Sequence, residues 1–406
     1  MIIQREEYLK WLRSAEGLKL IKVITGLRRV GKSTILAQFR DDLRRRGVKK
    51  AQIQSFNFEE RENSAFDDWR KLYDRIEQRL LPDQVNYIFL DEVQNVPEFE
   101  RAVDALFVRE NVDLYITGSN AYMLSGELAT LLSGRYISLH VLPYSFREYI
   151  QCFPERSGND RLFQQYLNSS ALPEVVSLTE RDKSLADQYL RDLYQTVVKK
   201  DIALRYNIRS EAMLDRTLRY LLSVIGSPIS PNGISNAFKA DRVSLHRDTI
   251  DNYLRYLCEC YLLYSVGRYD LKGKRILMTN DKYYTVDLGL RRLLLGSTVA
   301  SDQGHRLENI VYLELLRRNQ GVVYVGRSGD KEVDFLVQKN DGSRIYYQVA
   351  YQVDGQPETL ARELAPLQKI EDNYPKILLT NDLSHENING VQKINVVDWL
   401  LADNEE

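Results

Sequence analysis

Eight residues near the start of the chain have the types and the spacing of a loop that binds phosphate. They follow the pattern G-x-x-x-x-G-K-[ST] and are Gly26, Leu27, Arg28, Arg29, Val30, Gly31, Lys32 and Ser33. The two glycines let the backbone curl so that successive N–H groups point inward at phosphate oxygens. Lys32 would bring a positive charge to the β- and γ-phosphates of a nucleotide, and the Ser33 hydroxyl would be a ligand for Mg²⁺. The pattern predicts a nucleotide-binding loop, which we take to include the next residue, Thr34.

The segments on either side of this loop are those that a phosphate site requires. Residues 20–25 (LIKVIT) are apolar and rich in β-branched side chains, which predicts a buried strand. Residues 32–45 are typical of a helix, and the positive end of its dipole would meet the phosphates. This context makes a chance match to the loop pattern the weaker interpretation.

A second motif lies roughly 60 residues after the loop, a spacing common in enzymes that hydrolyse ATP. Residues 87–92 (YIFLDE) are an apolar strand that ends in two acids. Asp91 is placed to hold the Mg²⁺ shell, and Glu92 is placed to polarise the attacking water. Together with the loop, this pair favours hydrolysis of ATP over binding alone.

Two further positions could act on the same nucleotide. A predicted helix at 96–110 and a strand at 112–117 lead to Ser119 and Asn120, and either residue could sense the γ-phosphate or cap the next helix at 121–132. Arg135 precedes a last strand at 136–142. It could neutralise charge on the ATP of a neighbouring subunit, or it could be an ordinary surface arginine.

The alternation of strands and helices through residue 147 predicts a mostly parallel sheet covered on both faces. The segments GLRRVGKST, YIFLDE, YITGSN, LLSGRY and LPYSFREY occur in this order. With them, the sequence resembles the prokaryotic AAA-type ATPases that carry an appended domain of unknown function. The resemblance runs through most of the chain. It implies Walker A roles for Lys32 and Ser33, Walker B roles for Asp91 and Glu92, a sensor 1 position at Ser119-Asn120, and an arginine finger at Arg135.

Bulk composition excludes several classes of protein. The 406 residues are 44% hydrophobic and 28% charged, with a formal net charge of −1, so no global charge directs the chain to nucleic acid or membrane. The three cysteines offer neither a disulfide framework nor a metal-binding pattern. No apolar run approaches the roughly 20 residues that span a bilayer, and the N-terminus lacks a signal-like apolar region. We expect a cytoplasmic protein without a membrane partner.

Residues 148–210 and 211–300 predict two different helical regions. The first has an apolar stripe at Leu185, Tyr189, Leu193, Thr196 and Val197, which suits a lid near the nucleotide. The second predicts helices at 211–224, 234–239 and 245–261, the last one capped by Ser244, followed by strands at 262–269 and 283–286, which together indicate a winged-helix domain. The exposed side of its third helix mixes acids with bases, whereas the strand pair carries Arg268, Lys272, Lys274 and Arg275. DNA binding and a purely structural packing role both stay open.

Residues 301–406 resemble the restriction-endonuclease-like fold without its complete chemistry. Glu308 on a helix at 307–319, Asp334 on a strand at 332–337 and Gln348 on a strand at 346–350 match the acidic positions of that fold. The position of its lysine is Ala350, and no lysine in the same strand replaces it. We therefore expect a degenerate nuclease fold in which Asp334 pairs with an arginine such as Arg327. The pair Arg362-Glu363 could belong to the same polar cluster.

The sequence thus predicts an α/β protein with four parts. These are a P-loop AAA-type ATPase domain at 1–147, a helical lid at 148–210, a winged-helix domain at 211–300 and a nuclease-like domain at 301–406. The predicted function is Mg²⁺-dependent hydrolysis of ATP, coupled through the C-terminal half to a DNA or protein partner, in a chain that could form a homo-oligomer. The alternatives are an ATP-regulated scaffold with little turnover and, less favoured, an ATP-dependent nuclease.

Overall fold

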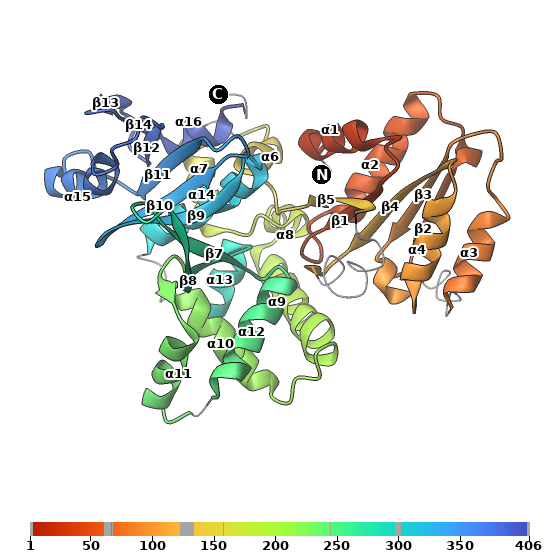
Figure 1. Ribbon diagram of the computed structural model, residues 1–406, viewed down its shortest axis with the longest axis horizontal. Helices are drawn as coiled ribbons and strands as arrows, with labels where there is room; N and C mark the ends of the chain where they lie inside the picture. The colour runs from red at the N-terminus through yellow and green to blue at the C-terminus, as the bar shows by residue number, and fades with distance from the viewer. Residues whose placement is uncertain are drawn as a thin grey trace. The chain divides into compact units, whose positions relative to one another are not determined.

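The computed structural model describes residues 3–60, 66, 68–121, 134–156, 158–243, 245–296 and 302–403. The chain forms two compact units, each with its own sheet (Figure 1). One unit comprises Met1–Pro143 with Glu259–Tyr261, and the other comprises Tyr144–Cys258 and Leu262–Glu406. The predicted helix at 121–132 and the predicted cap Ser244 fall almost wholly outside the described residues.

The first unit is built on a five-stranded parallel sheet with the order β2-β3-β4-β1-β5. Its strands are β1 (Ile21–Thr25), β2 (Ile53–Asn57), β3 (Asn86–Asp91), β4 (Val112–Gly118) and β5 (Tyr136–His140). Its helices are α1 (Glu6–Ala15), α2 (Lys32–Arg45), α3 (Trp69–Glu77) and α4 (Phe99–Val108), with 3₁₀ turns at Lys50–Gln52 and Val93–Asn95.

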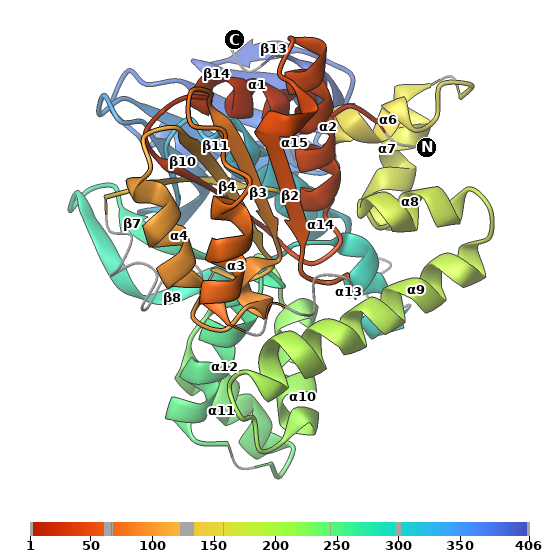
Figure 2. The ribbon, with the colours of Figure 1, turned by 90° about the vertical axis from the view of Figure 1, so that its right-hand side faces the viewer.

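Alternation along the strands explains why helices cover both faces of this sheet. In β3, Ile88 and Leu90 belong to the core cluster that also contains residues of α3 and α4. The intervening Phe89 packs with Phe39 of α2, at 6.3 Å between ring centroids. Figure 2 shows α3 and α4 side by side on one face. Because successive strand residues point to opposite faces and both faces are covered, the middle of β3 is a continuous apolar run. The predicted α/β fold with a parallel P-loop sheet is confirmed.

The second unit has helices before, between and after its strands. They are α6 (Phe146–Gln151), α7 (Asn159–Asn168), α8 (Pro173–Thr179), α9 (Lys183–Thr196), a π-helical segment (Val197–Leu204), α10 (Glu211–Ser223), α11 (Pro231–Ala240), α12 (Arg247–Glu259), α13 (Leu288–Leu295), α14 (Gln303–Arg318), α15 (Pro357–Gln368) and α16 (Val396–Leu401). The prediction for α9 was wrong in part, because Leu185 is exposed. The buried face begins at Ala186 and Leu190 instead, whereas Leu193 and Val197 are buried as predicted.

One nine-stranded sheet runs through the second unit in the order β13-β14-β12-β11-β10-β9-β7-β8-β6 (Figure 1). The strands are β6 (Pro228–Ile229), β7 (Leu263–Asp270), β8 (Arg275–Thr285), β9 (Val322–Ser328), β10 (Lys331–Gln338), β11 (Arg344–Ala350), β12 (Lys376–Thr380), β13 (Glu386–Ile388) and β14 (Val391–Asn395). β7 pairs in parallel with β9, which joins the predicted wing to the C-terminal strands. The division into domains at 147, 210 and 300 stays a prediction, and strands from both sides of residue 300 share this sheet.

Candidate nucleotide-binding site

The predicted phosphate loop connects the end of β1 to the start of α2. Gly26 has φ +145° and Gly31 has φ +100°, both in the region that favours glycine. A Cβ atom on Gly26 would lie 2.3 Å from the carbonyl oxygen of Val141, so no other residue fits there without a backbone shift. The turn places the loop at the N-terminus of a 14-residue helix, where unpaired N–H groups and the helix dipole favour an anion.

A buried arginine, Arg5, holds this loop in place by hydrogen bonds. The Arg5 guanidinium donates to the carbonyl of Val30 at 2.9 Å and to the carbonyl of Leu142 at 3.0 Å. The side chain therefore ties the loop to the segment that follows β5. Among the loop's own arginines, Arg28 forms an ion pair with Glu59, and Arg29 is exposed with φ +69°.

Lys32 is the buried centre of the site. Its ammonium donates to the carbonyls of Gly26 at 3.0 Å and Leu27 at 3.3 Å. It also forms an ion pair with Glu92 Oε1 at 3.2 Å. The structure thus brings the loop lysine together with the second acid of the β3 motif, although the two residues are far apart in the chain.

The two acids at the end of β3 have different environments. Burial raises the pKa of Asp91, against hydrogen bonds from the hydroxyls of Ser33 and Thr117 that lower it. Burial also acts to raise the pKa of Glu92, but the charge of Lys32 and a hydrogen bond from Gln94 outweigh it and leave that pKa below its ordinary value. This shift favours the ionised form of Glu92, which is the form that the predicted proton acceptor requires.

Thr117 on β4 fixes the position of both acids. Its hydroxyl donates to Asp91 Oδ1 at 2.5 Å and accepts from the backbone N–H of Glu92 at 2.9 Å. The sequence prediction missed this residue. A buried hydroxyl on the strand next to the acidic one was the signal that could have identified it.

Ser119 and Asn120 follow β4 and are both buried. Ser119 reaches the acids through Gln94, whose amide nitrogen lies 3.5 Å from the Ser119 hydroxyl and 2.5 Å from Glu92 Oε2. The structure therefore connects the first of the two predicted sensor residues to Glu92 through a glutamine that the sequence prediction did not select.

Arg135 is not brought to this cluster within its own chain. Its guanidinium pairs with Asp104 of α4 and lies 5.6 Å from the centre of the Phe107 ring. The register pairs Tyr136 with Ile21, at the start of β1, whereas the loop follows the end of β1. At about 3.3 Å per residue, Arg135 lies roughly 20 Å along the sheet from the loop. An action on ATP through a neighbouring subunit stays a prediction.

The donor set fits Mg²⁺. The Ser33 hydroxyl and the Asp91 carboxylate are hydrogen-bonded to each other, and both are the hard oxygen ligands that Mg²⁺ prefers. No group of three or more His, Cys, Asp or Glu residues in the described part of the chain is arranged to hold a metal ion by itself.

The carboxylates of the C-terminal region form a second cluster, and its cation comes from β8. Lys282 Nζ lies 2.9 Å from Glu308 Oε1, 2.7 Å from Glu332 Oε1 and 3.7 Å from Asp334 Oδ1. Burial alone would lower the pKa of Lys282, but these carboxylates outweigh it and hold that pKa well above its usual value. The sequence prediction missed Lys282, because the lysine of this fold was expected at position 350 in β11.

The expected pairing of Asp334 with Arg327 is wrong. Asp334 Oδ2 accepts from the backbone N–H of Val349 at 2.9 Å, whereas Arg327 Nε donates to the carbonyl of Gly329. Arg327 and Asp334 occupy adjacent antiparallel strands, but the register places Arg327 opposite Glu332 rather than Asp334. Glu363 does join the cluster, since its carboxylate accepts from the Gln348 amide at 2.9 Å.

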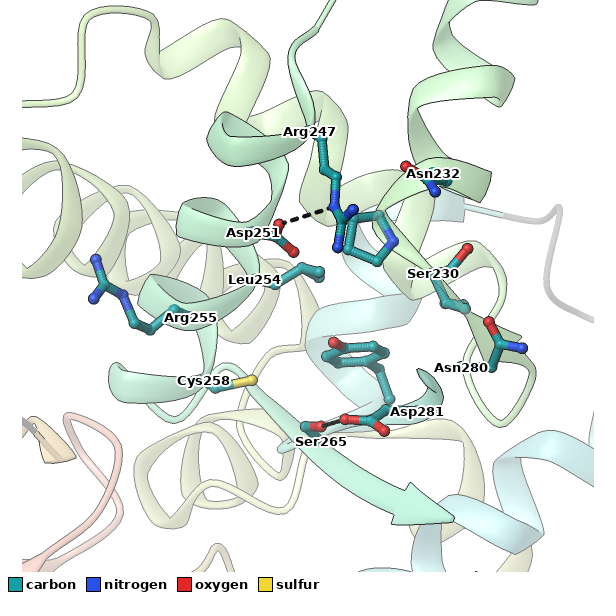
Figure 3. A pocket seen from close by; sticks show the side chains of 13 residues that line it. Ser230, Asn232, Arg247, Asp251, Leu254, Arg255, Cys258, Ser265, Asn280 and Asp281 are labelled. Atoms are coloured by element: carbon teal, nitrogen blue, oxygen red, sulfur yellow. Dashed lines mark hydrogen bonds and ion pairs between the residues drawn. The ribbon is translucent and has the colours of Figure 1, made fainter. Parts of the chain in front are cut away.

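The predicted third helix of the winged helix is α12, which lines a cavity of about 600 Å³. Arg247 pairs with Asp251 at 3.5 Å, and Ser265 donates to Asp281 at 2.8 Å across the cavity from them (Figure 3). Arg255 extends away from the other labelled side chains. The arginines that line this cavity are balanced by aspartates, so its charge gives no net attraction for a phosphate backbone.

The parallel sheet, the glycine-bounded loop at a helix N-terminus and the paired strand-end acids define an AAA-type P-loop protein. The model for the AAA domain matches residues 19–150, and a model for a domain of unknown function matches residues 160–301. In the described residues, no helix has both the length and the apolarity needed to cross a membrane.

Whole-length relatives then identify the family. An uncharacterized protein of Haemophilus influenzae is 39% identical over 405 residues, which is 98% of this chain and 99% of that protein. A Methanocaldococcus jannaschii protein is 28% identical over 93% of this chain and 86% of its own length. A Walker-type ATPase of Pyrococcus abyssi has 16% identity and a TM-score of 0.47, covering 72% of this chain and 96% of that chain. The chain belongs to the family of the Haemophilus protein, a family of prokaryotic AAA-type ATPases.

Proposed function

We propose that this protein binds ATP with Mg²⁺ at the loop of residues 26–34 and hydrolyses it, and that the nucleotide state is coupled to a partner through the C-terminal half. The observation that carries the proposal is the buried cluster of Lys32, Asp91 and Glu92 at the N-terminus of α2. A scaffold that only binds nucleotide would not need the second acid. This acid is buried, and the lysine and Gln94 keep it ionised.

The chemistry follows from what each group can exchange. Lys32 contacts two carbonyls and one carboxylate, and phosphate oxygens are stronger partners than the carbonyls. ATP binding would move the ammonium to the β- and γ-phosphates and leave Glu92 Oε1 able to accept a proton from water. Mg²⁺, held by Ser33 and Asp91, would neutralise charge on the phosphates. Ser119 or Asn120 would report the presence of the γ-phosphate.

The decisive experiment separates binding from hydrolysis. Glu92→Gln should retain ATP affinity and lose phosphate release by at least about 100-fold, since it removes the proton acceptor but keeps the shape of the side chain. Glu110→Gln changes the same charge at an exposed site on the same unit and should behave like the wild type. Normal turnover in Glu92→Gln would show that the proton acceptor is assigned wrongly.

A homo-oligomer is part of the proposal, because Arg135 can only serve a site in another subunit. Lys32→Ala and Arg135→Ala proteins should each be inactive. A mixture should regain activity, since a Lys32→Ala subunit still offers its arginine to an intact loop. Arg101→Ala, at an exposed arginine on α4, is the control. Full activity of Arg135→Ala alone would exclude the finger.

A basic surface supports nucleic acid as the partner. The turn between β7 and β8 lies between two grooves of about 460 and 540 Å³, and Arg275 lines both. The charged residues along the grooves, which we call the basic hairpin surface, are Lys272, Lys274, Arg275, Arg327 and Lys339, with Asp270 as the only acid. Unlike the cavity beside α12, this surface has a net positive charge that complements a phosphate backbone.

Binding of a fluorescein-labelled duplex oligonucleotide tests this surface. The triple substitution Lys272→Ala, Lys274→Ala and Arg275→Ala should weaken binding. It should also flatten the salt dependence by roughly 0.9 in log–log slope for each phosphate that is no longer neutralised. Arg44→Ala with Lys49→Ala and Lys50→Ala removes the same charge from exposed positions of the first unit and should have little effect. Equally weakened binding in both triples, or binding by neither the variants nor the wild type, would reject the surface.

A further inference from the structure

Gln94 is the residue outside the sequence motifs that contacts the acid Glu92 most closely. It lies in the 3₁₀ turn Val93–Asn95, directly after β3. Glu92 itself has φ +54°, a left-handed conformation that is unusual for a residue other than glycine. This reversal of the backbone folds the turn back, so that the Gln94 side chain lies over the carboxylate two positions before it.

The contacts of Gln94 define the orientation of its amide. The nitrogen donates to Glu92 Oε2 at 2.5 Å and lies 3.5 Å from Ser119 Oγ. A carboxylate oxygen accepts and an amide oxygen cannot donate, so the nitrogen is the amide atom that contacts Glu92 and the oxygen is left for another donor. That oxygen, Oε1, is buried and has no hydrogen-bond partner among the residues that the structure describes.

A buried amide oxygen without a partner costs about 1–3 kcal/mol, and such atoms are uncommon in native proteins. Next to a carboxylate that accepts protons, this oxygen is suited to accept a hydrogen bond from a water molecule. The two groups are complementary, because one water has two hydrogens and each acceptor can take one. Lys32 occupies the other carboxylate oxygen, Glu92 Oε1, at 3.2 Å.

We propose that Gln94 is a positioning residue for ATP hydrolysis, which holds Glu92 through its amide nitrogen and orients the attacking water through its amide oxygen. In the reaction, the water oxygen forms a bond to the γ-phosphorus. The bond between that phosphorus and the bridging β–γ oxygen breaks, and ADP leaves with the electron pair. The proton of the water passes to Glu92. When ATP draws Lys32 towards its phosphates, Gln94 is the contact that keeps the carboxylate in place.

This inference rests on the proposed ATPase activity, so the wild-type rate of phosphate release is measured first. Gln94→Met keeps the length of the side chain and removes both polar atoms. It should lower kcat by about 10–100-fold, because a misplaced general base loses rate on that scale. KM and the dissociation constant for ATP should stay within about twofold of the wild-type values, since the hydrogen bonds of Gln94 go to Glu92 and Ser119 rather than to the loop.

Two further variants separate positioning from a structural role. Gln94→Glu puts a negative charge against Glu92 and should be at least as slow as Gln94→Met. Gln78→Met, at a glutamine after α3 that is remote from the acids, should match the wild type. A kcat within twofold of wild type in Gln94→Met would overturn the inference, as would a parallel loss of ATP affinity and thermal stability. Absence of turnover in the wild-type protein would instead reject the ATPase proposal itself.

Discussion

Lys32 in the first unit and Lys282 in the second are both buried ammonium groups beside carboxylates, but their partners differ in kind. Lys32 has two carbonyls and a single carboxylate, Glu92, at distances of 3.0–3.3 Å. Lys282 lies 2.9 and 2.7 Å from the carboxylates of Glu308 and Glu332, with a third 3.7 Å away. The first ammonium can exchange its partners for phosphate at little cost, whereas the second already has stronger ones.

The backbone around each lysine supports the same difference between the two sites. Lys32 begins a helix after a glycine loop, so phosphate oxygens can approach it together with free N–H groups. Lys282 lies inside β8, where its backbone pairs with Val266 on one side and Pro228 on the other. Similar functional groups are thus arranged for ligand exchange in one unit and for internal neutralisation of charge in the other. The comparison teaches that a lysine and two acids are not enough to define a catalytic site.

The largest expected effect is the loss of ATP hydrolysis when Lys32 is removed. Lys32→Ala should reduce ATP hydrolysis by at least about 100-fold, since the ammonium stabilises charge on the transferred phosphoryl group. Isothermal titration measures the affinity for ATP, and a phosphate-release assay measures the rate of hydrolysis. Lys10→Ala, at an exposed lysine on α1, should change neither. Retained hydrolysis in Lys32→Ala would remove the basis of the comparison.

Removing Lys282, which is bound by carboxylates, should instead affect the stability of the fold. Lys282→Met leaves Glu308 and Glu332 without their shared cation, and breaking a buried ion pair on one side costs about 3–5 kcal/mol. Denaturant unfolding should detect this loss, while ATP affinity should stay unchanged in any protein that remains folded. The exposed Lys272→Met should shift stability by no more than about 0.5 kcal/mol. A stable Lys282→Met protein would mean that the lysine is not a structural counter-ion.

Local motifs explain how much of this could be predicted from sequence. The phosphate loop and the acids at the end of β3 are short runs of contiguous residues whose order fixes their geometry, so their positions could be predicted, while their roles stay predictions. The long-range partners were not. Arg5 reaches the carbonyl of Leu142 across 137 positions, and Lys282 on β8 meets Glu308 because α14 packs against that strand.

Two other errors have local physical causes. The first half of the apolar stripe of α9 was placed one residue off, because apolar residues on neighbouring positions fit two faces of a helix almost equally well. The partner of Asp334 was predicted wrongly because the register of the β9–β10 pair, which places Arg327 opposite Glu332, cannot be read from the residues themselves. Gln94 lies only two positions after Glu92, but its role depends on the left-handed backbone of Glu92, for which the sequence gives no signal.

A smaller effect concerns the pH dependence of stability in the second cluster. Burial and the charge of Glu308 raise the pKa of Asp334 to about 8, whereas Lys282 outweighs burial and lowers the pKa of Glu308 to about 2. A carboxyl group with a raised folded-state pKa stabilises the fold while it is protonated, and it loses that contribution as pH rises from about 4 to about 8. Wild-type stability should therefore fall across this range relative to that of Asp334→Asn.

Denaturant unfolding at several pH values measures this difference between the two proteins. Asp330→Asn, at an exposed acid in the turn before β10, should follow the wild type at every pH. A constant difference between wild type and Asp334→Asn from about pH 4 to about pH 8 would show that Asp334 is ionised throughout. The carboxylates would then be fully neutralised by Lys282, and the two lysine sites would differ even more than their distances indicate.

The last prediction is that DNA cleavage is absent. It tests whether the carboxylates around Lys282 are unable to bind a metal ion. Supercoiled and linear DNA incubated with the protein, ATP and Mg²⁺ or Mn²⁺ should remain intact, because Lys282 already neutralises the acids that a nuclease would use to hold its metal. Asp334→Ala and Glu92→Gln proteins prepared in parallel identify the source of any trace cleavage. Cleavage that disappears in Asp334→Ala would show that Lys282 can release its carboxylates to a metal. The second cluster would then be an exchangeable site like the first, with the lysine that β11 lacks supplied by β8.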